Sequence, residues 1–328
     1  MISVTALAGV PALVRESFGE KVLQHANRAA MLDIELIEDR DCFIPHATMT
    51  AFLAEVERRS GEDVGLLCAP HLSLGTYGCW GEYVLGGATL GEATGRAAAG
   101  IGYHSRGDRA ALSVRGGVAR IAYLSAARGR PGYAHVATGA AGVIVNLCRS
   151  WAPPGWRPLG VELDIPRPAA PGRYEEAFGC AVRFDAPAIA VRFPASLLAA
   201  ERAASAAGRR VLTLADVGRA RLEPASRDDL MGVVTAHVWS QVLAGAVSLD
   251  AVAQAIDVST RTLQRELRQR GTDFRSLRDA IRMQRARELL RGSGIPVTEI
   301  AAELGYSTPS NFARAFRKAV GVAPDAFR

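Results

Sequence analysis

The last hundred residues contain one apolar pattern twice, and this repeat limits the possible folds more than any other feature of the sequence. Four apolar residues recur at positions i, i+3, i+4 and i+7, a spacing that places them on one face of a two-turn helix. In the two copies, 48 positions apart, they are Leu249, Val252, Ala253 and Ile256, then Val297, Ile300, Ala301 and Leu304. The repeat predicts two short helices with buried faces, each with a small alanine that lets another helix approach closely.

A tight turn and a second helix are expected after each copy. Ser259 and Thr308 are good N-cap residues, and Pro309 suits a first helical position because the N–H that it lacks would have no partner there. The next inward-facing pairs, 49 positions apart, are Leu263 with Leu267 and Phe312 with Phe316. Two helices that meet through apolar faces across a short turn are typical of a helix-turn-helix, and we predict two such motifs, at about residues 248–270 and 296–318.

The outward faces of the two second helices carry the side chains that read DNA. Neither face holds an acidic residue. Arginine can donate two hydrogen bonds to guanine, glutamine or asparagine can pair with adenine, and basic side chains further along a helix suit phosphates. An ordinary solvated helix can carry the same residue types, but two such faces at matched spacing favour DNA binding. We predict base contacts from Arg261, Gln264, Arg265, Ser310, Asn311 and Arg314, and phosphate contacts from Arg268, Arg317 and Lys318.

A long helix is predicted between the two motifs, over Ser276–Arg291. Such a rigid connection would fix the separation of the two DNA-reading helices. If both enter successive major grooves on one side of the duplex, they lie about one helical turn, roughly 34 Å, apart. Residues 229–328 carry 14 basic and 10 acidic side chains, a net charge of +4 that is compatible with a polyanionic partner.

These segments resemble the DNA-binding domain of AraC/XylS-type bacterial transcription regulators. The resemblance covers Ser248–Leu267 and, more specifically, Ile295–Arg328, with its segments Ile-Pro-Val-Thr-Glu-Ile-Ala and Asn-Phe-Ala-Arg-Ala-Phe-Arg. One departure is Asp257, at a turn position where the family usually has the more permissive glycine. The resemblance implies double-stranded operator or promoter DNA as a partner, with RNA polymerase and a second copy of the chain as further candidate partners.

The preceding residues predict an α+β domain, with helices in its first half and then a small antiparallel sheet with helices against it. Helical patterns such as Ala51–Ser60 and Leu90–Ala99 come first. Two strands around Gly116-Gly117 and an apolar helix follow, and strand-like segments lie at 159–165, 182–184 and 189–193. Because Glu223-Pro224-Ala225-Ser226 interrupts any regular pattern, we place a sensing or dimerisation domain at 1–225 and an all-helical DNA-binding domain at 228–328.

The first domain is similar to the arabinose-binding-type sensor domain of one branch of the same family. The similarity rests on Leu74–Ala97, Trp156-Arg157-Pro158-Leu159 and Ala177–Phe184. It implies a small-molecule effector but does not specify arabinose. Aromatic and polar residues in this region are candidates for the effector pocket, although they also fit an ordinary half-buried core: Tyr77, Trp80, Tyr83, Tyr103 and His104.

No catalytic or metal-binding pattern accompanies these features. The five cysteines form no CxxC pair, and no histidine has a Cys, Asp or Glu at metal-ligand spacing. Cys79 could be a redox-sensitive thiol, but no basic neighbour in the sequence favours its thiolate, so an inert thiol is the preferred interpretation. The motifs GxSxG, HExxH and GxGxxG are missing. We therefore expect no cofactor, no metal and no enzyme activity.

Composition narrows the remaining classes of protein. With 49% hydrophobic and 22% charged residues, the chain of 328 residues can bury a sizeable core, so a disordered protein is excluded. No apolar run approaches the ~18 residues that cross a bilayer, and the N-terminus lacks a basic signal-peptide region, so we expect a cytoplasmic protein with no membrane partner. The sequence predicts a sequence-specific transcription regulator controlled by a small molecule. The alternatives are a regulator whose first domain only dimerises or binds a protein partner, and an enzyme domain fused to a helical module.

Overall fold

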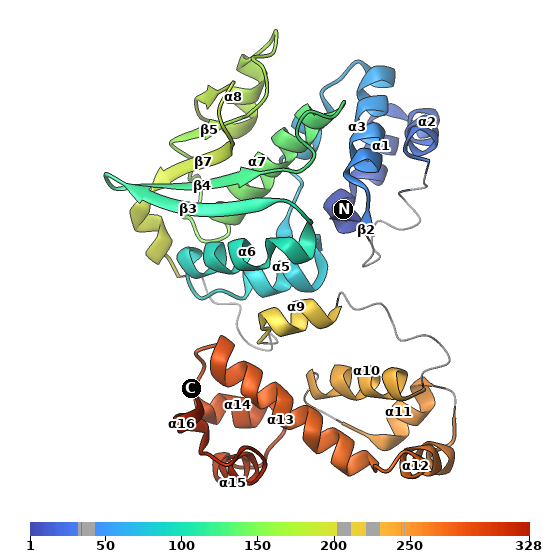
Figure 1. The fold of residues 1–328 in the computed structure, drawn as a ribbon. Helices are drawn as coiled ribbons and strands as arrows, with labels where there is room; N and C mark the ends of the chain where they lie inside the picture. Colours follow the sequence, from blue (N-terminus) through green and yellow to red (C-terminus); the bar gives the residue numbers. More distant parts are fainter. Residues whose placement is uncertain are drawn as a thin grey trace. The chain divides into compact units, whose positions relative to one another are not determined.

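Figure 1 shows the computed structural model of the chain, which describes residues 1–31, 34, 43–201, 211–220, 230–243, 245, 247–256 and 258–328. The chain divides into two compact units, residues 1–207 and 208–328. The interruption at 223–226 that set the predicted boundary lies outside the described residues, and so does Asp257. Among the helices of the described ranges, none is long and apolar enough to span a bilayer.

The first half of the first unit is mainly helical, as predicted. Its α-helices are α1 (Val10–Phe18), α2 (Glu20–Ala30), α3 (His46–Ser60), α4 (Val64–Cys68), α5 (Gly78–Leu85) and α6 (Leu90–His104). Side chains of α1 to α4, together with the N-terminal residues, form a hydrophobic core in which Val14, Phe52 and Val56 are fully buried. Two strands of two residues each, β1 (Ile2–Ser3) and β2 (Phe43–Ile44), pair beside it. They were not predicted, because two residues are too few to show an alternating pattern.

A five-stranded sheet with the order β3-β4-β7-β5-β6 follows the helices. The strands are β3 (Arg109–Arg115), β4 (Val118–Leu124), β5 (Gly160–Glu162), β6 (Val182–Arg183) and β7 (Ile189–Pro194). Gly116 and Gly117 join β3 to β4 with φ angles of 54° and 76°, the positive values that a primed hairpin turn requires. The α+β class is thereby confirmed, and helix α7 (Tyr133–Arg149) packs against the sheet (Figure 1).

One strand pair departs from the antiparallel expectation. β5 and β6 are parallel, whereas the other three pairs of this sheet are antiparallel. The chain between them passes through α8 (Gly172–Phe178), and a helical crossover of this kind brings the next strand back in the same direction. The sequence pattern indicates both strands but not the direction in which they pair.

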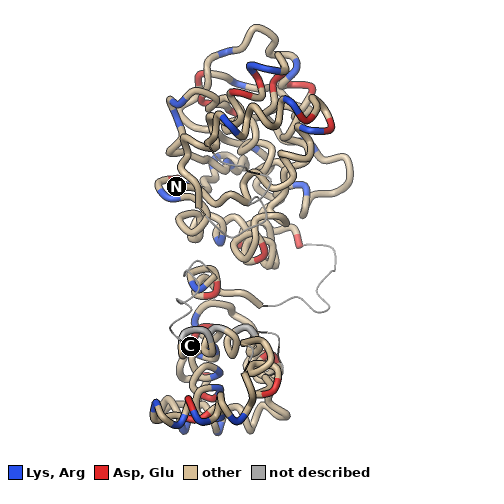
Figure 2. The backbone as a smooth tube through the Cα atoms, turned by 90° about the vertical axis from the view of Figure 1, so that its right-hand side faces the viewer, with Lys and Arg blue, Asp and Glu red and all other residues tan. Residues whose placement is uncertain are grey.

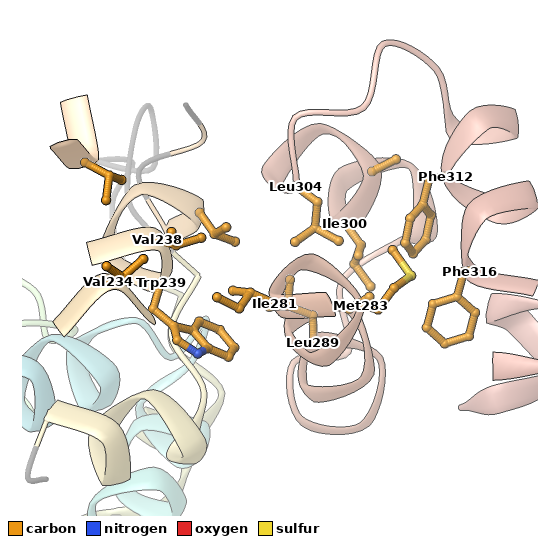
Figure 3. Packing of buried hydrophobic residues seen from close by; sticks show 14 of the residues in the cluster. Val234, Val238, Trp239, Ile281, Met283, Leu289, Ile300, Leu304, Phe312 and Phe316 are labelled. Carbon is orange, nitrogen blue, oxygen red and sulfur yellow. The ribbon is translucent and has the colours of Figure 1, made fainter. Parts of the chain in front are cut away.

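The described residues of the second unit form helices and no strand. These helices are α9 (Leu214–Ala220), α10 (Leu230–Leu243), α11 (Leu249–Ala255), α12 (Thr260–Gln269), α13 (Phe274–Gly292), α14 (Val297–Glu303), α15 (Pro309–Val320) and α16 (Pro324–Phe327). They share one hydrophobic core. In Figure 3 the buried side chains of α13 lie between those of α10 and those of α15, with those of α14 beside them. α13 therefore packs against α10, α14, α15 and α16.

Helix α9 joins the second unit through buried charges. Arg285 of α13 is only 1% exposed, and its guanidinium contacts the carboxylate of Asp216. Beside them, Arg219 Nη1 lies 2.6 Å from Glu288 Oε1, and the Arg219 guanidinium lies over the ring of Trp239. With this attachment α9 belongs to the second unit, which covers residues 208–328 and so starts before residue 228. No local sequence pattern indicates this, because the charged residues that make the contact are about 70 positions apart.

Candidate DNA interface and effector cavity

Helices α11 and α12 form the first predicted helix-turn-helix. Val252 and Ala253 of α11 are buried against the core, and so are Leu263 and Leu267 of α12. The hydroxyl of Ser259 accepts a hydrogen bond from the N–H of Thr262 at 3.1 Å and caps α12. The inward face and the cap of this motif therefore agree with the prediction.

The outward face of α12 is open to solvent. The four predicted DNA-contacting residues of this helix are exposed: Arg261, Gln264, Arg265 and Arg268. Glu266 lies to the side and is partly buried, and its Oε1 is 3.6 Å from Arg265 Nη2. An exposed pair of this kind contributes little to stability. The Arg265 guanidinium can therefore leave it for a base edge at small cost.

Helices α14 and α15 form the second motif. Phe312 and Phe316 are fully buried, and the Thr308 hydroxyl caps α15 by accepting from the N–H of Asn311 at 3.2 Å. Pro309 is the first helical residue, as predicted. The predicted DNA-contacting residues of this helix are all exposed: Ser310, Asn311, Arg314, Arg317 and Lys318.

Hydrogen bonds between side chains orient the face of α15. The Asn311 amide Nδ2 donates to Ser307 Oγ at 3.0 Å, and its Oδ1 accepts from Arg314 Nη2 at 2.9 Å. The two side chains most suited to reading bases are thus held beside each other before DNA is present. Such preorganisation lowers the conformational entropy lost on binding.

Both faces belong to the same end of the second unit. In Figure 1, α12 and α15 lie at the end away from α9, and Figure 2 shows several Lys and Arg positions along this end, with some Asp and Glu positions among them. Helix α13 has 19 residues, about 28 Å at 1.5 Å per residue, and it lies between the two motifs in the sequence. This length is of the same order as one turn of DNA, the spacing that two readers of successive major grooves need.

The first unit contains a cavity of about 130 Å³. Its walls come from the N-terminal residues, from α1 and α3 to α7, and from the β3–β4 hairpin. Three of the predicted effector residues line it together. The ring of His104 stacks against those of Tyr77 and Trp80, with centroid distances of 4.7 Å and 4.6 Å, and the Tyr77 and Trp80 centroids are 6.1 Å apart.

The other two predicted effector residues lie elsewhere. Tyr83 does not line the cavity and packs under the guanidinium of Arg96, 5.2 Å from its ring centroid. Tyr103 is 37% exposed on the outer side of α6. Both are close in sequence to the stacked residues, but on a helix neighbours in sequence point in different directions.

Sequence reasoning missed most of the cavity wall. α6 contributes Ala97 and Ala98, and α7 contributes Val136, Ala140 and Val143. These side chains are only half-buried although they are apolar. The sequence does contain one signal of a cavity. Alanine and glycine occupy helix faces on which a close-packed core would have larger residues.

A buried polar cluster beside the cavity was also missed. His135 Nε2 lies 3.0 Å from Glu57 Oε2, and His135 Nδ1 lies 3.2 Å from Asp63 Oδ1. The hydroxyl of Tyr174 donates to Asp63 Oδ2 at 2.5 Å. Burial alone would raise the pKa of Asp63, but the hydrogen bonds from His135, Tyr174 and the Leu66 N–H lower it to about 2. Burial opposes the charged imidazolium, yet the two carboxylates raise the pKa of His135.

The described residues contain no group of three or more His, Cys, Asp and Glu that could hold a metal ion. Cys68 and Cys148 are buried free thiols, and burial raises their pKa values to about 12. Thiols with such pKa values are almost entirely protonated at neutral pH and react slowly. Cys79, the thiol singled out from the sequence, is half-buried and is not part of a disulfide.

Comparison with known proteins places the chain in a family. Residues 23–201, more than half of the chain, match the profile of the arabinose-binding domain at the N-terminus of AraC transcription regulators. The chain belongs to the AraC family of transcription regulators. A helix-turn-helix profile matches residues 252–328 of this AraC-family chain and contains both motifs except the start of α11.

Individual relatives are also transcription regulators. Over 171 residues the chain is 32% identical to the ornithine utilization regulator of Pseudomonas aeruginosa, covering 51% of this chain and 49% of that protein. Over 82 residues it is 38% identical to the transcriptional activator RhaS of Escherichia coli, covering 25% of this chain and 30% of RhaS. The chain thus spans half or less of the length of these two relatives. The solved regulator CdpR of Pseudomonas aeruginosa aligns over 94% of this chain and 96% of its own, with 22% identity and a TM-score of 0.40.

Proposed function

We propose that the protein is a sequence-specific DNA-binding transcription regulator whose first unit responds to a small molecule. Base edges are read by Arg261, Gln264 and Arg265 of α12 and by Ser310, Asn311 and Arg314 of α15. Phosphates are held by Arg268, Arg317 and Lys318. The cavity lined by Tyr77, Trp80 and His104 is the effector site, and Tyr83 and Tyr103 contribute only to the surrounding structure.

The observation that carries the DNA-binding proposal is the pairing of two equivalent helices. Each has an apolar pair buried in the shared core and a face of exposed arginine and amide side chains on the opposite side. Arg265 and Arg314 occupy the same position in the two motifs, 49 residues apart. Neither predicted face holds an acidic residue that would repel phosphate. The family membership supports this proposal.

A regulator whose first unit only dimerises or binds a protein partner is the second candidate. The cavity argues for the small-molecule version, because an empty apolar cavity destabilises a fold unless something fills it. An effector acts only if it has different affinities for two states of the protein. Contact with RNA polymerase and self-association belong to the same proposal as further partners, and a location in the cytoplasm follows from the role in transcription.

The proposal is tested by selecting duplexes from a random library with the full chain and measuring affinity by fluorescence anisotropy. We expect one enriched sequence that binds at least ~10³-fold more tightly than random DNA at the same salt concentration. Arg265→Ala should reduce that preference. Arg173→Ala, which removes one positive charge from an exposed ion pair in the first unit, should not. If no sequence is enriched, the protein is not a sequence-specific regulator.

A further inference from the structure

The cavity in the first unit has almost no polar surface to offer a ligand. The side chains that line it include no Asp, Glu, Lys or Arg. A sugar exposes several hydroxyl groups, and each would need a hydrogen-bond partner on leaving water. The chemistry of these walls therefore does not match a pentose, in spite of the name that the matching family carries.

Several polar side chains in the walls are already occupied. The hydroxyl of Tyr123 donates to the carboxylate of Asp108, and the Thr94 hydroxyl donates to the carbonyl of Leu90 at 2.8 Å. His135 is engaged by Glu57 and Asp63. A ligand that relied on these groups would have to break hydrogen bonds within the fold.

Trp80 differs from these side chains. It lines the cavity and is 4% exposed, and its indole Nε1 is buried without a hydrogen-bond partner among the described residues. A buried Trp N–H usually has a partner, and leaving it unpaired is unfavourable. One hydrogen-bond acceptor on a ligand would satisfy this donor.

We propose that the effector is a compact, neutral, apolar molecule with a single hydrogen-bond acceptor. This inference rests on the proposed role of the first unit as a sensor and names the class of its ligand. The apolar body fills the space that Ala98 and Ala140 leave open, and the acceptor binds Trp80 Nε1. The size agrees, because an apolar cavity of roughly 150 Å³ accepts benzene and this one has about 130 Å³.

Three probes separate the ligand classes in a thermal unfolding experiment on the full chain. Acetophenone has a single ring and one carbonyl acceptor, ethylbenzene has nearly the same shape without the acceptor, and L-arabinose is the polar alternative. Acetophenone at 100-fold its Kd should raise the unfolding midpoint by roughly 5 °C or more. Ethylbenzene should bind roughly two- to ten-fold more weakly, which corresponds to one net hydrogen bond. L-Arabinose should leave the midpoint unchanged.

Two kinds of variant locate the site. Trp80→Phe keeps an aromatic wall but removes the donor, so it should bind acetophenone and ethylbenzene equally. Ala140→Leu fills the cavity from α7 and should abolish binding of acetophenone and of ethylbenzene. If that variant does not fold, Ala98→Leu fills the cavity from α6 and should have the same effect. Stabilisation by L-arabinose and not by acetophenone would overturn the proposal, as would acetophenone binding that neither Trp80→Phe nor a cavity-filling variant alters.

DNA affinity, measured on the same samples, keeps this inference separate from the proposed function. Selective DNA binding without any stabilisation by the aromatic probes would refute the ligand class alone. Stabilisation by acetophenone in a chain that selects no DNA sequence would refute the regulator and leave the cavity chemistry correct. If acetophenone binds in the cavity and DNA affinity does not change, the site does not act as an effector site for this class.

Discussion

Arg265 and Arg314 are the side chains on which specific recognition depends most in this account. Both are exposed at equivalent positions of α12 and α15. Replacing either with alanine should weaken binding to the selected duplex by ~1–3 kcal/mol and relax base preference at one position, because a bidentate contact to a base is lost. Titrations against single-base variants of the duplex measure both effects.

Lys318→Ala is the matched comparison on the same face of α15. A lysine that holds phosphate contributes equally to every sequence. This variant should therefore weaken specific and random DNA alike and make the slope of log K against log salt smaller by about 1. Equal behaviour of Arg314→Ala and Lys318→Ala would show that the predicted division into base and phosphate contacts is wrong.

His135 should give the first unit a pH-dependent stability. Its pKa is raised above 6.5 in the folded protein, so the stabilisation is complete below the unfolded value and is lost as the pH rises through the folded value. His135→Gln removes this contribution. Urea unfolding at several pH values between 5.5 and 9 should show wild type losing its advantage over the variant as the pH increases.

Asp63, in the same cluster, serves as the reference group for this experiment. The pKa of Asp63 is lowered to about 2, so its contribution is present above the unfolded value near 3.8 and is lost only in strong acid. Across pH 5.5–9, Asp63 thus stays ionised in wild type. A difference between the two proteins that did not depend on pH would mean that the pKa of His135 is the same in the folded and the unfolded chain.

Local residue patterns were predictable, and contacts between distant residues were not. The caps Ser259 and Thr308 and the buried pair Phe312 and Phe316 follow from spacing within a few residues. His135 and Asp63 are 72 positions apart, and no periodic pattern links them. Tyr77, Trp80 and His104 were chosen for their residue type, but only the fold shows which aromatic residues of that region share a cavity.

At the scale of elements, the attachment of α9 to α13 is the contact most sensitive to a single substitution. Arg285→Ala would leave the buried Asp216 carboxylate without its main partner, and breaking a buried pair in this way costs roughly 3–5 kcal/mol. Chemical unfolding of the variant should show that loss. The double variant Asp216→Leu/Arg285→Met removes both charges and should recover most of the stability.

The pH dependence of this contact provides its control. Burial would raise the pKa of Asp216, but Arg285 and the hydrogen bonds from Thr213 lower it overall. The stabilisation is therefore present above the unfolded pKa of about 3.8 and declines as the pH falls below it. Arg285→Ala should make that decline smaller, because Thr213 and Arg219 still contact Asp216. A decline of unchanged size in the variant would place its origin elsewhere.

The positions of helices and turns were predicted more reliably than the pairing of strands or the packing of one helix on another. The hairpin turn at Gly116-Gly117 and the long helix α13 appear where composition and period indicated. The parallel pairing of β5 with β6 was not predictable, because strands of three and two residues are too short to show a residue pattern that distinguishes parallel from antiparallel pairing. The place of α9 depends in the same way on a partner far along the chain.

Each of the two units has buried hydrophobic clusters of its own, among them one in residues 2–68 of the first unit and one in the second unit. In the proposed DNA-binding role, the second core holds the two DNA-reading helices in one body. Because α13 contributes to the same core as both motifs, their separation is set by packing and not by a flexible linker. Two sites bound by one rigid body contribute to a single association, so the spacing between them becomes part of the specificity.

Changing that spacing tests the central claim most directly. Five base pairs inserted between the two contacted half-sites turn one of them to the opposite side of the duplex, since a helical turn has about 10.5 base pairs. We predict that this insertion lowers affinity at least as much as Arg314→Ala does, and that Arg314→Ala has little further effect on the inserted duplex. Unchanged affinity for the inserted duplex in an anisotropy titration would contradict an account in which α12 and α15 read one face of DNA together.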